Sequence, residues 1–360
     1  MADLEEHGIG ISIRNLYKIF GSEPETYIEA VKSGMTKAEL NDKHNHVLGL
    51  KDINIEMPGG AIQVVMGLSG SGKSTLIRHI NRLIDPTAGE IIVGEEDVVG
   101  MNQLDLREFR RHKTAMVFQK FALLPHKTVL ENAGYGLEIQ GVPRKEQNEK
   151  AMRWINRVGL EGFEDNFPNQ LSGGMQQRVG LARALTNDAP ILLMDEAFSA
   201  LDPLIRMDMQ SVLLDIQKEI RKTIVFITHD LDEALRLGDR IAILRDGEVI
   251  QQGTKQEIVL RPADEYISNF VREVNRGRVI TVDMVMKEGP IANTAGMKIK
   301  AGTVLEKAAK RMTDQTISNA IVVNKDGAPV GTLDIQDVIS AMVTPVDHTM
   351  HEEDDEFVAA

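Results

Sequence analysis

The sequence predicts an α/β protein in which helices cover both faces of a parallel sheet, followed by a smaller α+β module. Two observations predict the first part: nearly uninterrupted apolar strands at 191–195 and 223–229, and an alternation of strands and helices up to about residue 255. Such strands are typical of parallel sheets that are buried on both faces. The change after about residue 275 to short strands and two helices predicts the small module.

Length and composition are those of an ordinary globular protein. The chain has 360 residues, 42% hydrophobic and 26% charged, and its formal net charge is −13. A net negative charge argues against broad, sequence-independent binding of nucleic acid, which needs a basic face. Cysteine is absent, which excludes disulfides, thiolate metal sites and cysteine nucleophiles. No apolar run approaches the roughly 18 residues that cross a bilayer, so we expect membrane association only through a partner.

The elements of the larger part follow in order along the chain. Residues 9–20 alternate between apolar and polar and predict an opening strand. Residues 21–46 are polar and helix-prone, and we interpret them as an insertion. Residues 47–66 predict a strand, a turn at 58–60 and the apolar strand AIQVVM. A helix should begin near Lys73 and end before the Asp85-Pro86 pair.

The predicted boundaries divide the chain at residue 275. Residues 276–345 form the α+β module, with a strand at 279–282, a helix at 303–312, strands at 320–324 and 330–333 separated by the turn KDGAP, and a helix at 335–342. Residues 346–360 are an acidic tail that contains EEDDE, which we interpret as a solvated end.

The segment GLSGSGKST at 67–75 has the spacing of a phosphate-binding loop and lies between a strand and a helix, as that loop requires. Its glycines let several backbone N–H groups point at phosphate oxygens, and the helix N-terminus adds favourable charge. Lys73 can reach the β- and γ-phosphates, and Ser74 can bind Mg²⁺. The predicted ATP-binding residues of this loop are Gly67, Ser69, Gly70, Ser71, Gly72, Lys73, Ser74 and Thr75.

Two further segments suit a nucleotide site. ILLMDE at 191–196 places Asp195 at the carboxyl end of a buried strand, where α/β sheets bind ligands. Asp195 would hold the Mg²⁺ shell, and Glu196 could polarise an attacking water. LSGGMQQR at 171–178 sets a serine and two glycines before a helix, which is a second anion-binding arrangement. Because one nucleotide rarely needs two such sites from one chain, we expect the second to face the nucleotide of another copy.

Taken in order with Gln119, SALD at 199–202 and His229, these segments resemble the ATPase subunits of ABC transporters. The motifs span residues 67–229, and the resemblance covers about 9–275. It implies a P-loop ABC ATPase domain with a RecA-like parallel sheet core, an antiparallel β subdomain and a helical subdomain. It also implies hydrolysis of ATP with Mg²⁺ as cofactor, in a head-to-tail homodimer.

The resemblance implies a role for each matching residue. Glu196 matches the general base, His229 the switch histidine and Gln119 the Q-loop, and these act with Lys73 in catalysis. The Mg²⁺ ligands would be Ser74, Gln119 and, through water, Asp195. The signature residues facing the partner's ATP would be Ser172, Gly173, Gly174 and Gln176, and the D-loop would comprise Ser199, Ala200, Leu201 and Asp202.

An aromatic residue stacks on adenine in this family. Phe20 stands at the matching place, with Tyr17 as the alternative, because the insertion at 21–46 blurs the register. Either aromatic would also suit a buried core.

A narrower resemblance is to the ATPases of glycine betaine/proline betaine importers, a group that also serves choline, carnitine and trimethylamine N-oxide. It rests on the 26-residue insertion and on the sequences at 64–91, 118–136 and 192–210. The resemblance implies import through an integral membrane permease, which would meet residues 122–136, with a periplasmic or lipid-anchored binding protein supplying substrate. The chain would lie peripherally on the cytoplasmic face of the inner (plasma) membrane and bind no nucleic acid. The alternative is an importer ATPase for another small solute, such as an amino acid.

The C-terminal module resembles one cystathionine-β-synthase-type (CBS) repeat, over residues 320–342. Relatives often carry two repeats, whereas one is identifiable here. A role in sensing ionic strength or nucleotides and a purely dimerising role therefore both remain open. Two rival classes are ABC ATPases without a membrane partner and regulatory modules without hydrolysis. The single phosphate-binding loop argues against the first, and Glu196 with His229 against the second.

Overall fold

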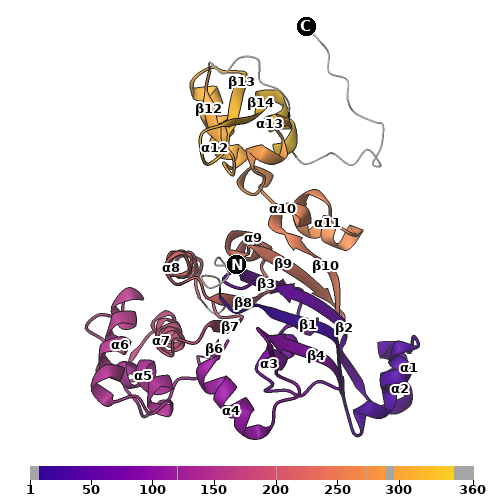
Figure 1. Ribbon diagram of the computed structural model, residues 1–360, viewed down its shortest axis with the longest axis vertical. Coiled ribbons are helices and arrows are strands. Elements are labelled where there is room, and N and C mark those ends of the chain that lie inside the picture. The colour runs from indigo at the N-terminus through magenta and orange to yellow at the C-terminus, as the bar shows by residue number, and fades with distance from the viewer. Residues whose placement is uncertain (1–7, 120, 200, 273, 289–295, 344–360) are drawn as a thin grey trace. The chain divides into compact units, whose positions relative to one another are not determined.

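The computed structural model describes residues 8–119, 121–199, 201–272, 274–288 and 296–343 (Figure 1). The chain forms two compact units, Met1–Ile258 and Val259–Ala360. The predicted domain boundary between residues 275 and 276 was based on the change in sequence pattern and stays a prediction. The predicted acidic tail, 346–360, lies outside the described residues.

The larger unit is built on a six-stranded sheet of order β10-β9-β3-β8-β7-β6. All neighbouring strands in it are parallel except β9 and β10. The central strands β3, β7 and β8 are buried along their whole length, which confirms the predicted parallel sheet. The strands are β3 (Ile62–Met66), β6 (Thr114–Val117), β7 (Ile191–Asp195), β8 (Thr223–Thr228), β9 (Arg240–Arg245) and β10 (Glu248–Thr254).

A second sheet of the larger unit is entirely antiparallel and has the order β2-β1-β4-β5. Its apolar side chains pack with α3 (Lys73–Ile80) and with strands of the parallel sheet in one continuous core. The antiparallel β subdomain expected from the resemblance is therefore present. Its strands are β1 (Ile11–Phe20), β2 (Val47–Met57), β4 (Ala88–Val93) and β5 (Glu96–Asp97).

The helical subdomain consists of α5 (Val129–Ile139), α6 (Arg144–Arg157) and α7 (Gly173–Thr186), which pack against one another (Figure 1). Thr128 begins α5 with a capping box to Glu131, which satisfies free amides at the helix start. The remaining helices of the unit include α4 (Gln103–His112), α8 (Pro203–Ile220), α9 (Leu231–Leu237) and most of α10 (Lys255–Leu260). None of the helices among the described residues has the length and apolar character needed to cross a bilayer.

The predicted insertion connects the paired ends of β1 and β2, where Phe20 lies opposite Val47. It folds into a 3-10 turn η1 (Pro24–Tyr27) and two short helices, α1 (Ile28–Lys32) and α2 (Lys37–His44). Its apolar side chains form a small separate core with both strands. The members are Tyr17, Ile19, Ile28, Val31, Leu40 and Leu48.

The smaller unit contains α11 (Glu265–Val271) and a four-stranded sheet of order β11-β14-β13-β12. Its apolar core is its own, with α12 and α13 packed against each other. The predicted helices and the strands near 320–324 and 330–333 are present. The elements are η3 (Arg276–Arg278), η4 (Val282–Met284), β11 (Lys287–Glu288), β12 (Lys298–Lys300), α12 (Leu305–Asp314), β13 (Asn319–Val323), β14 (Pro329–Asp334) and α13 (Ile335–Met342).

The strand predicted at 279–282 is wrong. Ile280 and Val282 are fully buried, which accounts for the apolar pattern. Their backbone groups, however, pair with the start of α12 and the turn before it: Leu305 donates to the Ile280 carbonyl, and Val282 donates to the Thr303 carbonyl. Among the described residues the segment forms a single isolated bridge, between Thr281 and Val304, and it continues as a 3-10 turn.

His79 on α3 makes stability depend on pH. The side chain is fully buried, its Nδ1 lies 2.7 Å from the Thr75 carbonyl oxygen, and its Nε2 has no hydrogen-bond partner within the part of the chain that the structure describes. Burial lowers the pKa of His79 from 6.5 to about 4. Between pH 6.5 and about pH 4, this histidine is protonated in the unfolded chain and neutral in the folded chain. The free energy of unfolding therefore decreases as pH falls through that range.

We expect this histidine to reduce the free energy of unfolding by about 2 kcal/mol between pH 7 and pH 5. Urea unfolding at both pH values measures this change in the free energy of unfolding for the wild type and for His79→Gln. The glutamine keeps a donor for the Thr75 carbonyl. The variant should lose less stability on acidification. Equal losses in the two proteins would contradict the prediction.

Candidate active site

The predicted phosphate-binding loop turns sharply between β3 and α3. Gly72 has φ of 100°, and a Cβ there would lie 2.8 Å from the Gly49 carbonyl oxygen. At Gly67, with φ of 155°, a Cβ would lie 2.2 Å from the Leu244 carbonyl oxygen. Both backbone conformation and space therefore exclude larger residues. The hydroxyl of Ser71 is buried in the loop and has no hydrogen-bond partner among the described residues.

Lys73 lies inside this loop. Its Nζ donates to the carbonyl oxygens of Gly67 at 2.7 Å and Leu68 at 2.9 Å, and the side chain is only 4% exposed. Burial lowers the pKa of Lys73, an effect that nearby Glu196 and Asp195 oppose. A buried ammonium whose ion pair with Glu196 is long, at 4.0 Å, is well placed to meet an incoming anion.

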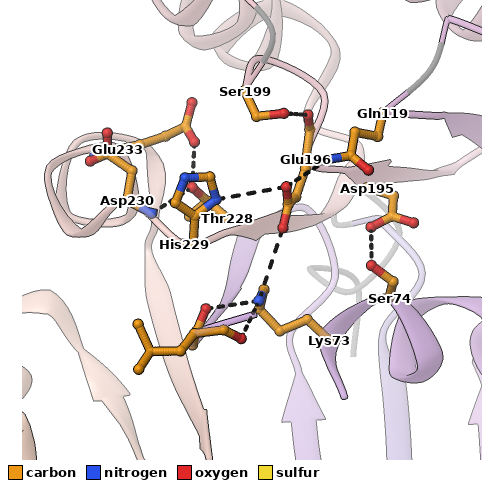
Figure 2. A network of polar contacts seen from close by, with 12 residues as sticks. Lys73, Ser74, Gln119, Asp195, Glu196, Ser199, Thr228, His229, Asp230 and Glu233 are labelled. Carbon is orange, nitrogen blue, oxygen red and sulfur yellow. Dashed lines mark hydrogen bonds and ion pairs between the residues drawn. The ribbon is translucent and has the colours of Figure 1, made fainter. Parts of the chain in front are cut away.

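Glu196 is the meeting point of three predicted catalytic side chains, as Figure 2 shows. Its carboxylate accepts a hydrogen bond from Gln119 Nε2 at 2.9 Å. It lies 4.0 Å from Lys73 Nζ and 3.7 Å from His229 Nδ1. The backbone of Glu196 has φ of 47°, a left-handed conformation that is uncommon for a residue with a side chain.

Sheet topology explains why these residues meet. β3, β8 and β7 are parallel neighbours, so their carboxyl ends lie at one edge of the sheet. The loop at 67–72 follows β3, Asp195 ends β7, and His229 follows β8. At the same edge, Ser74 Oγ donates to Asp195 Oδ1 at 2.7 Å, and Arg78 Nη2 donates to Asp195 Oδ2 at 3.4 Å.

The residues predicted to hold Mg²⁺ fit that ion. The Ser74 hydroxyl and the Asp195 carboxylate are in direct contact, and Gln119 reaches the adjacent Glu196. Hydroxyl, carboxamide and carboxylate oxygens are the hard ligands that Mg²⁺ prefers.

The loop opens onto a cleft of about 400 Å³. Phe20 lines one side of this cleft and is 38% exposed, with Lys18 Nζ 5.2 Å from its ring centre. Tyr17 is 7% exposed and belongs to the small core beneath the insertion. Of the two aromatics proposed for adenine stacking, only Phe20 lines the cleft, and its contact with adenine stays a prediction. The lining residues are Phe20, Lys37, Val47, Leu48, Gly49, Ser69, Gly70, Gly72, Lys73, Ser74, Thr75, Gln119 and Glu196.

The segment LSGGMQQR lines a different cleft, of about 500 Å³. Ser172 is the N-cap of α7, with its Oγ accepting from the Met175 amide at 3.3 Å. Gly173 and Gly174 lie beside it, together with Leu201 and Asp202 of the D-loop segment. This cleft and the first one have no lining residue in common among the described residues.

Two predicted residues of these segments lie elsewhere or cannot be placed. Gln176 donates to the carbonyl oxygens of Pro168 and Leu171 of its own chain, and it does not line the cleft. Ala200 lies outside the described residues. Ser199 donates to the Glu196 carbonyl oxygen at 2.9 Å, and Asp202 caps α8.

The sequence interpretation missed two residues that connect these loops. Arg206 on α8 donates to the carbonyl oxygens of Ser199 and Leu201 and to Asp230 Oδ2, so it bridges the D-loop segment and the residue after His229. Glu233 is buried and accepts from Thr228, the residue before His229 (Figure 2).

Burial raises the pKa of Glu233, and its hydrogen bonds with Thr228 and Gln210 oppose that change. An arginine four residues after a capping aspartate, and an acid four residues after a histidine, were the available signals.

Comparisons with known proteins agree with this geometry. The profile of the ABC transporter family matches residues 50–199, and the CBS domain profile matches residues 273–344. The chain is 54% identical to the glycine betaine transport ATP-binding protein OpuAA of Bacillus subtilis over 79% of this chain and 68% of that protein. It is 45% identical to the trimethylamine N-oxide transport system ATP-binding protein TmoW of Pelagibacter ubique, over 86% and 91%. A solved structure similar to it is the dimeric, post-hydrolysis ATP-binding cassette MJ0796 bound to ADP and Pi, with 32% identity, a TM-score of 0.59 and coverage of 68% and 98%.

Proposed function

The chain belongs to the ATP-binding subunits of the ABC transporter family, and on this basis we propose that it powers import of glycine betaine or a related quaternary ammonium or methylamine compound. The family resemblance, fold and ATPase activity predicted from the motifs are confirmed by these relatives. The related compounds are choline, proline betaine, carnitine and trimethylamine N-oxide. A transport ATP-binding subunit is a peripheral, membrane-associated protein, and we place it on the cytoplasmic face.

One observation carries the chemical part of the proposal: Lys73, Gln119 and His229 all surround the carboxylate of Glu196. Glu196 would accept a proton from the attacking water as the water oxygen approaches the γ-phosphorus. Lys73 would leave the loop carbonyls to bind phosphate oxygens, and His229 would hold the water and the γ-phosphate.

Mg²⁺, when bound, neutralises charge on the phosphates and holds them in position. We assign Ser74 and Gln119 as its ligands, with Asp195 acting through water. The 2.7 Å contact between Ser74 and Asp195 supports this assignment.

We propose that two copies act together. Each chain presents a cleft with the phosphate-binding loop and another with Ser172, Gly173 and Gly174, and the two linings are separate. In a head-to-tail homodimer, ATP would lie between the first cleft of one copy and the second cleft of its partner. MJ0796, described as dimeric, supports the arrangement. The CBS-like module could add to this dimer or report ionic strength or nucleotides.

The permease would dock near residues 122–136. A groove of about 210 Å³ borders the C-terminal end of that segment, between β6, α5 and α7, and is lined by Tyr135, Ile139 and Arg183 among others. Ile139 is 49% exposed, so the groove offers apolar surface beside cationic side chains. A helical segment of a membrane protein suits such a groove. The substrate-binding protein would act on the permease and reach this chain only indirectly.

Transport by the native complex tests the proposal. A tag on this chain should recover an integral membrane permease from membranes of the source cells. Vesicles reconstituted with that complex and its binding protein should accumulate radiolabelled glycine betaine, choline or trimethylamine N-oxide when ATP is supplied on the side of this chain. Uptake of an amino acid and of none of these methylated compounds would favour the alternative importer. Recovery of the chain without any membrane protein would contradict the proposal.

A further inference from the structure

The insertion contributes one charged side chain to the predicted ATP cleft. Lys37, the first residue of α2, lines the cleft together with Phe20, Gly49 and Thr75. Neither the motifs nor the family resemblance gave this lysine a role. The cleft therefore holds a second lysine besides Lys73, and it comes from a segment outside the motifs.

Lys37 is presented from an anchored scaffold. The apolar side chains of α1 and α2 pack on β1 and β2 next to the Phe20 and Val47 pair. The buried ring of His46 contacts the Ser22 and His44 carbonyl oxygens at 2.7 and 2.6 Å, and the Tyr27 ring packs against it. The backbone that carries Lys37 is thus fixed relative to the aromatic end of the cleft.

Local contacts compensate the charge of Lys37 poorly. It stands in the first turn of α2, after the N-cap Thr36, where the helix dipole disfavours a cation. Its ion pair with Asp246 is long, at 3.7 Å, and both side chains are largely open to solvent, with 44% and 78% exposed. Exposed pairs of this kind add little to stability. A nearby anion of higher charge would therefore compete easily for the ammonium.

We propose that Lys37 makes an ionic contact with the phosphates of the bound nucleotide and exchanges Asp246 for them. The inference rests on the proposed ATP site. The insertion thereby becomes part of the nucleotide site rather than a surface addition. Asp246 acts as a competitor that holds the lysine at the rim when nucleotide is absent.

Nucleotide affinity measured without turnover tests this contact. In a Glu196→Gln background, the Kd of a fluorescent ATP analogue and of ATP in competition is measured for Lys37→Ala, Lys37→Gln and Lys37→Arg. We expect Kd to rise about three- to tenfold for alanine and glutamine and to stay near the parent for arginine. Lys43→Ala is the matched control, because Lys43 lies on the same helix and pairs with Glu39 away from the cleft. Parental affinity in Lys37→Gln would overturn the ionic contact.

The variant Asp246→Asn distinguishes a contact between Lys37 and the nucleotide from a purely structural role of the Lys37–Asp246 ion pair. If Lys37 binds phosphates, this variant frees the lysine and leaves Kd unchanged or lower. A rise in Kd as large as that of Lys37→Ala would show that the ion pair itself shapes the cleft, and would overturn the inference. Failure of the parent to bind ATP would overturn the proposed function instead, whereas intact binding in both the parent and Lys37→Ala would overturn only the role of Lys37.

Discussion

Replacing Glu196 with glutamine should lower ATP hydrolysis about a hundredfold or more, because the reaction loses its proton acceptor. Glutamine has nearly the same shape, so the contact with Gln119 and the position beside Lys73 can persist. The phosphate-binding loop is untouched, and ATP affinity should stay within a few-fold of the wild type. Phosphate release and equilibrium binding of ATP, measured on the same preparations, check both halves of this expectation.

Glu149→Gln provides the matched control, since Glu149 is an exposed residue of α6 outside the cleft. It should hydrolyse ATP like the wild type. A stable dimer of Glu196→Gln should also accumulate in the presence of ATP, because hydrolysis no longer separates the copies. Size-exclusion chromatography would detect this dimer. Wild-type turnover in Glu196→Gln would rule out Glu196 as the general base.

The second large effect is expected at Ser172. Arginine at this position would fill the cleft formed with Gly173 and Gly174 and exclude a partner's phosphates. Hydrolysis should fall about a hundredfold, as when donors to a transition state are removed. Binding of ATP to the single chain should survive, because the other cleft shares none of these residues.

Loss of the Ser172 cap on α7 costs about 1 kcal/mol, which urea unfolding will register without abolishing the fold. Ser268→Arg adds the same side chain on the exposed surface of α11, at a position that is not among the lining residues of either cleft, and it should leave hydrolysis unchanged. Combined with Glu196→Gln, Ser172→Arg should prevent the ATP-dependent dimer. A double variant that still dimerises would contradict the role assigned to Ser172.

The phosphate-binding loop could be located from sequence because strand, glycines and helix are contiguous. The contact of Ser74 with Asp195 could not, since it depends on β7 lying two strands from β3 in the sheet. Strand order of this kind is set by long-range packing rather than by local pattern. The family resemblance assigned both residues to one Mg²⁺ site, and the structure brings them into contact.

Other positions show where local patterns are insufficient. Irregular register between β1 and β2 buries both Leu16 and Tyr17, so simple alternation could not decide which aromatic reaches the cleft. At 279–282, the apolar pattern indicated burial correctly, but among the described residues this segment forms a single bridge, from Thr281 to Val304, and not a strand. Arg206 acts through backbone carbonyls of another loop, a contact for which the sequence carries no periodic signal.

Separate clefts in one chain also have a kinetic consequence. In the proposed dimer no single copy completes a reaction site, so in dilute solution the hydrolysis rate would grow with the square of the protein concentration. A permease that holds two copies side by side would replace this encounter with a high effective concentration. The membrane partner would then set the rate of ATP hydrolysis through the local concentration of the two copies alone. It would do so before it transmits any conformational change through the groove beside α5.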